Sequence, residues 1–224
     1  MSFYTPQQHQ AIHMDANSQD ASLPTVLLLG DSISIGYSPY VRDALAGIAN
    51  IVRPSDAQGM LINCGSTAFG VEELDAWLAE CKADIIHFNW GLHDIAYRHP
   101  DAQVYGNRDK INGTLSVTPF DYAQNLQIIV QKLRTTGAKL VWATTTVVPP
   151  DEAGRFVGDE VKYNAIAQNI MQQMDIPVND LYAITAPFAA NMFVCPGDVH
   201  YTEEGYQIVA RQVVDALMPL LRNL

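Results

Sequence analysis

Cysteine is scarce in this chain, and no pattern of metal ligands is evident. The three cysteines, Cys64, Cys81 and Cys195, are widely spaced and form no CxxC pair. An odd number of cysteines at such spacing argues against a disulfide framework and gives no sign of a zinc site. His9 and His13 stand four residues apart, as on one helical face, but a third ligand is missing. We therefore expect no bound metal.

Positive charge and long apolar runs are also lacking. The chain has only 13 Lys and Arg residues but 24 Asp and Glu residues, which gives a formal net charge of −11. Nucleic acid and anionic membranes are polyanions, so we expect neither as a partner. No apolar run approaches the ~20 residues that a membrane helix needs.

The first 24 residues are rich in Gln, His, Ser and Asp, and they lack the basic start and apolar segment of a secretory signal. We therefore expect a cytoplasmic protein, with a signal already removed as the alternative. We interpret residues 1–24 as an N-terminal arm and residues 25–224 as one domain. The 48% hydrophobic content suits a single α/β core, which commonly spans about 200–250 residues.

Strand-like and helix-like patterns alternate through the domain. Apolar runs predict five strands, at 26–29, 48–53, 84–90, 139–144 and 176–179. Helical periodicity predicts a helix from about Tyr40 and further helices at 71–81, 120–134, 161–174 and 203–221. Such alternation indicates a parallel sheet with helices on both faces. The weakly patterned segment 96–119 is either a lid or substrate loop or an ordinary surface loop.

The first apolar run leads directly into Gly30-Asp31-Ser32. A buried strand that ends in a small turn exposes the next side chain at the carboxyl edge of the sheet, where open α/β folds place their chemistry. Ser32 is therefore either a nucleophile or simply the N-cap of the next helix. The GxSxG elbow of α/β-hydrolases and the lysine of a phosphate-binding loop are both absent here.

Polar clusters follow the later strands and precede the last helix. These clusters are Asn63-Cys64-Gly65, Gly91-Leu92-His93-Asp94 and Asp198-Val199-His200. In an open parallel sheet the strand ends meet at one edge, and the loop before the last helix can join them. Together with Ser32 they supply a hydroxyl nucleophile, a base for its proton and donors for an oxyanion. Ester cleavage requires these three kinds of group.

These four blocks, in this order, resemble those of the SGNH (GDSL-type) hydrolase family. The block at Gly30 is close to the family's GDS motif, and Gly65 matches the glycine of its second block. The block at Gly91 reads Gly-Leu-His-Asp against Gly-x-Asn-Asp, and the block that ends at His200 reads Asp-Val-His against Asp-x-x-His. The resemblance extends over residues 25–224. It implies a three-layer, flavodoxin-like α/β/α sandwich with about five parallel strands.

The resemblance also implies a serine esterase with Ser32 as the nucleophile and His200 as the general base. The backbone N–H groups of Ser32 and Gly65 would form part of the oxyanion hole. The implied substrates are small esters, often acetyl groups on carbohydrates, cleaved without any cofactor. Lipid and thioester substrates remain open, as does the oligomeric state.

Two positions depart from the family pattern. His93 stands where the family has an asparagine that donates a side-chain N–H to the oxyanion. We predict that the imidazole takes this role, the alternative being that it only orders its loop. The family's acid lies three residues before the histidine, where this chain has Gly197. We predict that Asp198 orients His200 instead, with a backbone carbonyl as the alternative.

These departures keep a second hypothesis open, a non-catalytic carbohydrate-binding protein on an SGNH scaffold. Other residues near the blocks receive lesser roles. Asp31, Asn63 and Asp94 are predicted to be structural, accepting backbone N–H bonds that fix the loops around the site. Arg155 follows the fourth strand, and we predict that it contacts an acidic sugar or a carboxylate of the substrate.

Overall fold

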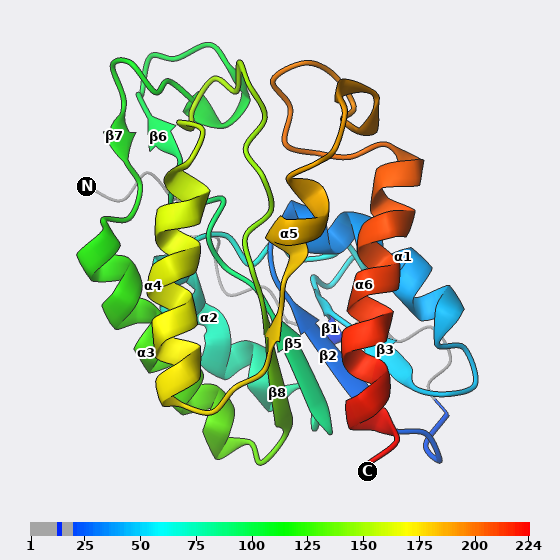
Figure 1. The fold of residues 1–224 in the computed structure, drawn as a ribbon. Helices are drawn as coiled ribbons and strands as arrows, with labels where there is room; N and C mark the ends of the chain where they lie inside the picture. Colours follow the sequence, from blue (N-terminus) through cyan, green and yellow to red (C-terminus); the bar gives the residue numbers. More distant parts are fainter. Residues whose placement is uncertain (1–12, 15–19) are drawn as a thin grey trace.

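The computed structural model describes residues 13–14 and 20–224, so most of the predicted N-terminal arm, His9 included, lies outside the described residues. A five-stranded sheet forms the centre (Figure 1). In spatial order its strands are β3 (Asn50–Val52), β2 (Thr25–Leu29), β5 (Ile85–Phe88), β8 (Lys139–Ala143) and β9 (Val178–Asn179). All neighbouring pairs are parallel. The strand that comes first along the chain, β2, lies between β3 and β5, which come second and third in this sheet. This is the flavodoxin-like order, and it confirms the predicted fold class.

Helices cover both faces of this sheet. On one face, α1 (Ser32–Ala44) packs against α6 (Glu203–Leu221). On the other face, α2 (Thr67–Ala79), α3 (Pro119–Thr135) and α4 (Asp159–Gln173) pack side by side (Figure 1). The protein is therefore a three-layer α/β/α sandwich.

The apolar core lies between these layers. Residues 26–29 of β2 have no exposed surface, because a parallel sheet covered by helices buries both sides of its strands. This burial explains why β2 reads as a continuous apolar run. Trp77, Trp90 and Trp142 also lie in the core.

The first helix begins earlier than its sequence pattern predicted. We placed its start near Tyr40, whereas α1 starts at Ser32, immediately after the turn that ends β2. The carboxylate of Asp31 accepts the N–H of Ile33 at 2.9 Å and caps the helix. The early turns hold Ser and Gly residues of weak helix propensity, and tertiary packing against α6 outweighs that weakness.

Several loops rise above the carboxyl edge of the sheet (Figure 1). The weakly patterned segment 96–119 contains an antiparallel pair, β6 (Tyr97–Arg98) with β7 (Thr114–Leu115), and a single 3-10 turn, η1 (Tyr105–Asn107). The remaining short elements are β1 (His13–Met14), which pairs with β4 (Pro54–Ser55), then α5 (Leu181–Thr185) and η2 (Ala190–Met192). No sequence pattern had predicted α5.

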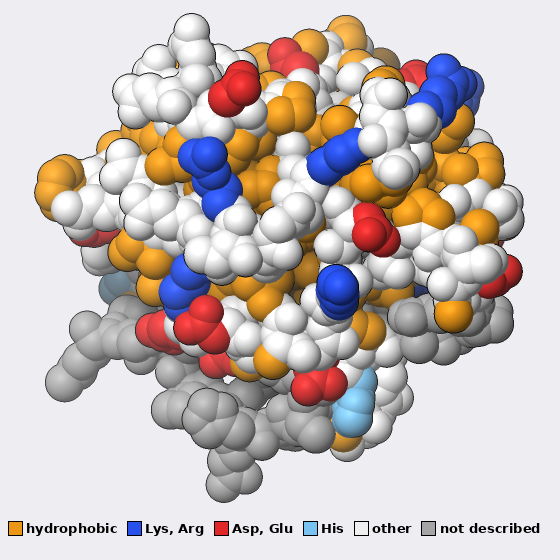
Figure 2. All heavy atoms as spheres, turned by 90° about the horizontal axis from the view of Figure 1, so that it is seen from below, with side chains coloured by type: hydrophobic (Ala, Val, Ile, Leu, Met, Phe, Trp, Pro, Cys, Tyr) orange, Lys and Arg blue, Asp and Glu red, His pale blue; other side chains and the backbone are white. Residues whose placement is uncertain are grey.

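The opposite end of the molecule, seen from below in Figure 2, mixes Lys and Arg with Asp and Glu among apolar side chains. On this face the excess of acidic residues is not gathered into one patch. Within the described part of the chain, every helix is too short or too polar to cross a membrane.

Gly36 provides a test of how closely α1 and α6 pack. A Cβ atom at this position would lie 2.1 Å from Cζ of Tyr206. We expect Gly36→Ala to lower the free energy of unfolding by about 1–3 kcal/mol through overpacking, as measured by urea denaturation. Adding Tyr206→Leu should recover part of this loss by removing the ring. Wild-type stability of the single variant would contradict the close approach.

Candidate active site

The described structure brings together Ser32, His200 and Asp198, the three residues predicted to be catalytic. Ser32 Oγ lies 2.8 Å from His200 Nε2, and His200 Nδ1 lies 2.6 Å from Asp198 Oδ1. The same carboxylate oxygen accepts the backbone N–H of His200 at 2.9 Å. A carboxylate, an imidazole and a hydroxyl thus stand in the order of a catalytic triad.

Ser32 is placed by the junction of β2 and α1. It is the first residue of the helix, directly after the capping residue Asp31, and its side chain is partly buried. The N–H groups of a first helical turn have no intrahelical partners, and the helix dipole makes this end favourable for negative charge. The backbone N–H of Ser32 is therefore not used within the helix, and its donation to an oxyanion stays a prediction.

The loop that carries His200 is held by its own main chain. Val194 N–H donates to the His200 carbonyl at 3.0 Å, and Asp198 N–H donates to the Cys195 carbonyl at 3.1 Å. Two residues after His200, Thr202 caps the start of α6. The imidazole is thus fixed between a closed loop and a helix N-terminus.

Gly197 explains why the acid stands at a different position from the family's. Its φ of 75° lies in the left-handed region, which favours glycine. A Cβ atom there would lie 2.7 Å from the backbone oxygen of Asp151. An aspartate three residues before His200 would therefore be strained and would collide with the neighbouring loop. Asp198 reaches the imidazole from the next position instead.

The environment of Asp198 favours its charged form. Burial on its own would raise the pKa of this carboxyl group. Hydrogen bonds from the backbone N–H and the ring of His200 outweigh burial and hold the pKa below its ordinary value. The carboxylate is therefore ionised at neutral pH and can stabilise an imidazolium on His200.

Two further carboxyl groups, Asp31 and Asp94, are buried beside the site. Burial raises the pKa of Asp31, which caps α1. Asp94 accepts the backbone N–H of Thr67 at 2.9 Å and its hydroxyl at 2.5 Å. Burial nevertheless raises the pKa of Asp94 to about 7. Both side chains bond the first residues of helices, contacts that fit the structural roles predicted for them.

His93 and Gly65, the other predicted oxyanion residues, meet at the side chain of Asn63. Asn63 Oδ1 accepts the Gly65 N–H at 3.0 Å, and Asn63 Nδ2 lies 3.4 Å from His93 Nε2. Burial, together with the charge of Arg155, lowers the pKa of His93 to about 3. The imidazole is therefore neutral near pH 7 and can donate one N–H.

Arg155 is buried, with only 4% of its surface exposed. Its Nε donates to the Leu92 carbonyl at 2.6 Å, and its Nη1 lies 2.9 Å from the carboxylate of Glu152. Glu152 has no exposed surface and also pairs with Arg108 at 2.5 Å. Arg155 thus ties the loop of His93 to a buried ion cluster, and its contact with substrate stays a prediction.

Sequence reasoning did not single out Glu152 or Arg108. The spacing of three residues between Glu152 and Arg155 was a weak signal of an ion pair. Nothing in the sequence indicated that Arg108, which lies 44 residues earlier, would join them.

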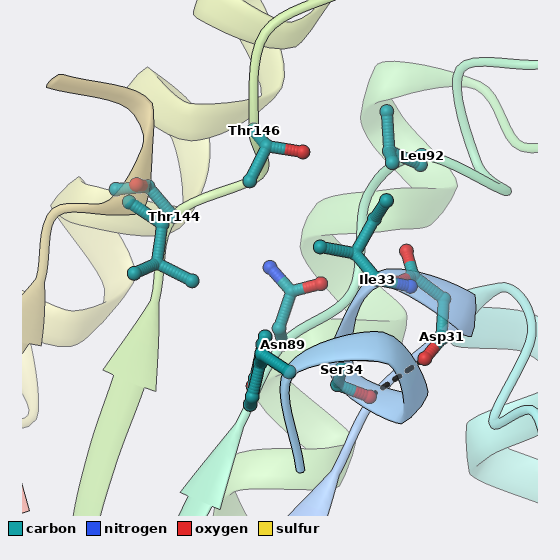
Figure 3. Close-up of a pocket in the computed structure, with 9 residues that line it drawn as sticks. Asp31, Ile33, Ser34, Asn89, Leu92, Thr144 and Thr146 are labelled. Atoms are coloured by element: carbon teal, nitrogen blue, oxygen red, sulfur yellow. Dashed lines mark hydrogen bonds between the residues drawn. The ribbon is translucent and has the colours of Figure 1, made fainter. Parts of the chain in front are cut away.

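A small cavity lies beside the turn that carries Ser32 (Figure 3). Its volume is about 10 Å³, room for roughly one water molecule. Among the residues that line it are Asp31, Ile33, Asn89, Leu92 and Thr146. Ser32 and His200 do not line this cavity, so it is separate from the side chains of the triad.

The match to a protein family agrees with this geometry. A sequence model of the GDSL-like lipase/acylhydrolase family matches residues 28–208. The chain belongs to this family. As a GDSL-like acylhydrolase, it is an enzyme that hydrolyses ester bonds. No curated protein matches it in sequence.

Solved structures share the fold of this GDSL-like hydrolase at low sequence identity. A lipase/acylhydrolase from Enterococcus faecalis has a TM-score of 0.67 and 17% identity, over 88% of this chain and 96% of that one. The acetyl xylan esterase AlAXEase has a TM-score of 0.63 and 16% identity, over 86% and 99%. A carbohydrate esterase family 3 protein from Talaromyces cellulolyticus has a TM-score of 0.64 and 20% identity, over 90% of this chain and 99% of that one.

The state of His93 in this GDSL-like hydrolase can be measured directly. Because burial lowers its pKa to about 3, we expect the ring to stay neutral down to about pH 5. In the unfolded chain it takes up a proton near pH 6.5, so this residue removes stability as the pH falls below about 6.5. NMR titration of the imidazole, assigned with a His93→Asn variant, tests this. A midpoint near 6.5 would contradict it.

Proposed function

We propose that this hydrolase is a serine esterase that removes small acyl groups, above all acetyl, from carbohydrates. The main support is the continuous contact from Asp198 through His200 to Ser32. A partly buried hydroxyl at a helix N-terminus, in contact with an oriented imidazole, suits nucleophilic catalysis.

In the first half of the reaction, Ser32 Oγ adds to the ester carbonyl carbon while His200 Nε2 takes the hydroxyl proton. The carbonyl oxygen becomes an oxyanion, and Asp198 stabilises the imidazolium. When the intermediate collapses, the C–O bond to the alcohol breaks. His200 gives its proton to the departing oxygen, which leaves an acyl group on Ser32.

The second half repeats these steps with water. His200 takes one proton from a water molecule, whose oxygen adds to the acyl carbon. The bond to Ser32 Oγ then breaks, His200 returns the proton to Ser32, and the carboxylic acid leaves.

Two observations favour an acyl group on a sugar. Segment 96–119 carries exposed polar and aromatic side chains, Tyr105 with 92% of its surface exposed among them. Aromatic faces and hydrogen-bonding groups are well suited to sugars. Two of the solved structures with this fold are named as an acetyl xylan esterase and a carbohydrate esterase.

Removal of the nucleophile is the primary test. We expect Ser32→Ala to reduce hydrolysis of p-nitrophenyl acetate to the background rate and to abolish labelling by a serine-reactive organophosphonate. Ser38→Ala, an equally small change on the same helix, is the matched control, because its hydroxyl only bonds the Ile35 carbonyl. Turnover that survives in Ser32→Ala would contradict a serine esterase.

A panel of acetylated sugars, longer acyl esters and acyl thioesters, assayed with Ser32→Ala as the blank, then identifies the substrate class. A preference for acetylated sugars supports the proposal. Sugar binding without turnover that depends on Ser32 would instead support a carbohydrate-binding protein on the same scaffold.

Asp198 can be tested separately. Asp198→Asn keeps the size of the side chain but removes the charge that holds the imidazole. We expect kcat to fall roughly 100- to 10,000-fold, with KM much less affected. The exposed Asp101→Asn is the control for loss of one negative charge at the same edge. If Asp198→Asn kept full activity, a backbone carbonyl would be the group that orients His200.

A further inference from the structure

The carboxamide of Asn63 occupies the region where the oxyanion hole was predicted. It lies between the two predicted donors other than Ser32: its Oδ1 accepts the Gly65 N–H at 3.0 Å, and its Nδ2 lies 3.4 Å from His93 Nε2. Asn63 itself is partly buried. The side chain is therefore fixed at both of its polar atoms while one side of it remains accessible.

The bond to Gly65 decides which way the carboxamide faces. A buried backbone N–H needs an acceptor, and the oxygen is the only acceptor that a carboxamide offers. The NH2 group must then face His93. The Gly65 N–H is consequently engaged by Asn63 and is not free to point directly at a substrate.

The environment of His93 decides where its single proton lies. Among the described residues, Nδ1 is buried and has no hydrogen-bond partner. Nδ1 is therefore unpaired whichever ring nitrogen carries the proton. Because the NH2 group of Asn63 faces Nε2 at 3.4 Å, the hydrogen bond between them makes Nε2 the acceptor and places the proton on Nδ1. Asn63 then donates one N–H to His93 and keeps its second N–H for another acceptor.

We propose that Asn63 is a catalytic residue whose second side-chain N–H binds the oxyanion, while Nε2 of His93 accepts the first N–H and holds the carboxamide in place. This assignment rests on the proposed esterase function. The developing negative oxygen accepts from the second N–H of Asn63 and from the N–H of Ser32. Gly65 acts through Asn63: its N–H polarises the carboxamide and strengthens the opposite N–H as a donor. In the resembled family, the asparagine amide that donates to the oxyanion stands in the third block. In this chain Asn63, in the second block, supplies that amide.

The decisive variant is Asn63→Asp. It keeps the side-chain size and an oxygen that accepts the Gly65 N–H, but it replaces the NH2 group with a second carboxylate oxygen. We expect kcat for p-nitrophenyl acetate to fall roughly 100- to 1,000-fold, with KM changed less than about threefold. Labelling of Ser32 by the organophosphonate should slow as well, because its phosphoryl oxygen needs the same donors.

Asn191→Asp is the matched control. It makes the same change on η2, which lies in the loop before His200, and its side chain is exposed. We expect this variant to keep near-wild-type kcat, which would separate loss of a donor from a general effect of added negative charge. Both variants are assayed well below their thermal midpoints, so a modest loss of stability does not affect the rates.

Two variants of His93 test its contribution separately from that of Asn63. His93→Asn retains a side-chain acceptor for the N–H of Asn63 and should keep most activity, whereas His93→Ala should lose it. If Asn63→Asp keeps wild-type kcat while Ser32→Ala is inactive, the esterase function stands and the role of Asn63 is wrong. If Ser32→Ala keeps activity, the proposed function itself fails, whatever Asn63 does.

Discussion

The contact between Ser32 and His200 joins residues that are 168 positions apart, and the site depends on it. Ser32 begins α1, and His200 stands three residues before α6. Both helices lie on the same face of the sheet and pack against each other (Figure 1). The distance between hydroxyl and imidazole is therefore set by helix packing, in which Gly36 allows the ring of Tyr206 to approach closely.

Buried polar groups concentrate near the carboxyl edge of the sheet, and each is stabilised in a different way. Glu152 pairs with the two arginines Arg108 and Arg155, whereas burial favours the neutral forms of His93 and Asp94. Isolated charges in such a place would be very costly, so pairing and neutralisation are the available solutions. Under the proposed mechanism, such fixed dipoles need little reorganisation when an oxyanion forms at Ser32, which is how preorganised sites lower a barrier.

If Asn63 has the proposed role, it shows how a family site can change while its chemistry is kept. A histidine has replaced the third-block asparagine, and a carboxamide from the neighbouring loop lies against the histidine's ring. Gly197 is a second example, because a left-handed backbone leaves no room for the acid at its usual place. In both cases the required atom comes from an adjacent position, since the hydrolysis of an ester depends on where donors and charges lie in space.

Much of the fold could be predicted because its signals are local. Apolar runs bounded by small residues identified the sheet, and the last helix was predicted with the bounds that it has, Glu203–Leu221. The start of α1 was wrong, and the short helix α5 was missed. Both elements are stabilised by packing against α6, which a short window of sequence does not record.

The features of the site also divide into those that the sequence predicted and those that only the tertiary structure decided. The order of the four blocks pointed to Ser32, His200, Gly65 and His93 as candidates at one end of the sheet, because a parallel sheet brings its strand ends to one edge. Only the tertiary structure decided that Asp198 reaches the imidazole, that Arg155 turns inward, and how the Asn63 carboxamide faces. These contacts depend on the backbone path of loops and on burial by distant segments. Residue type and spacing along the chain do not encode either property.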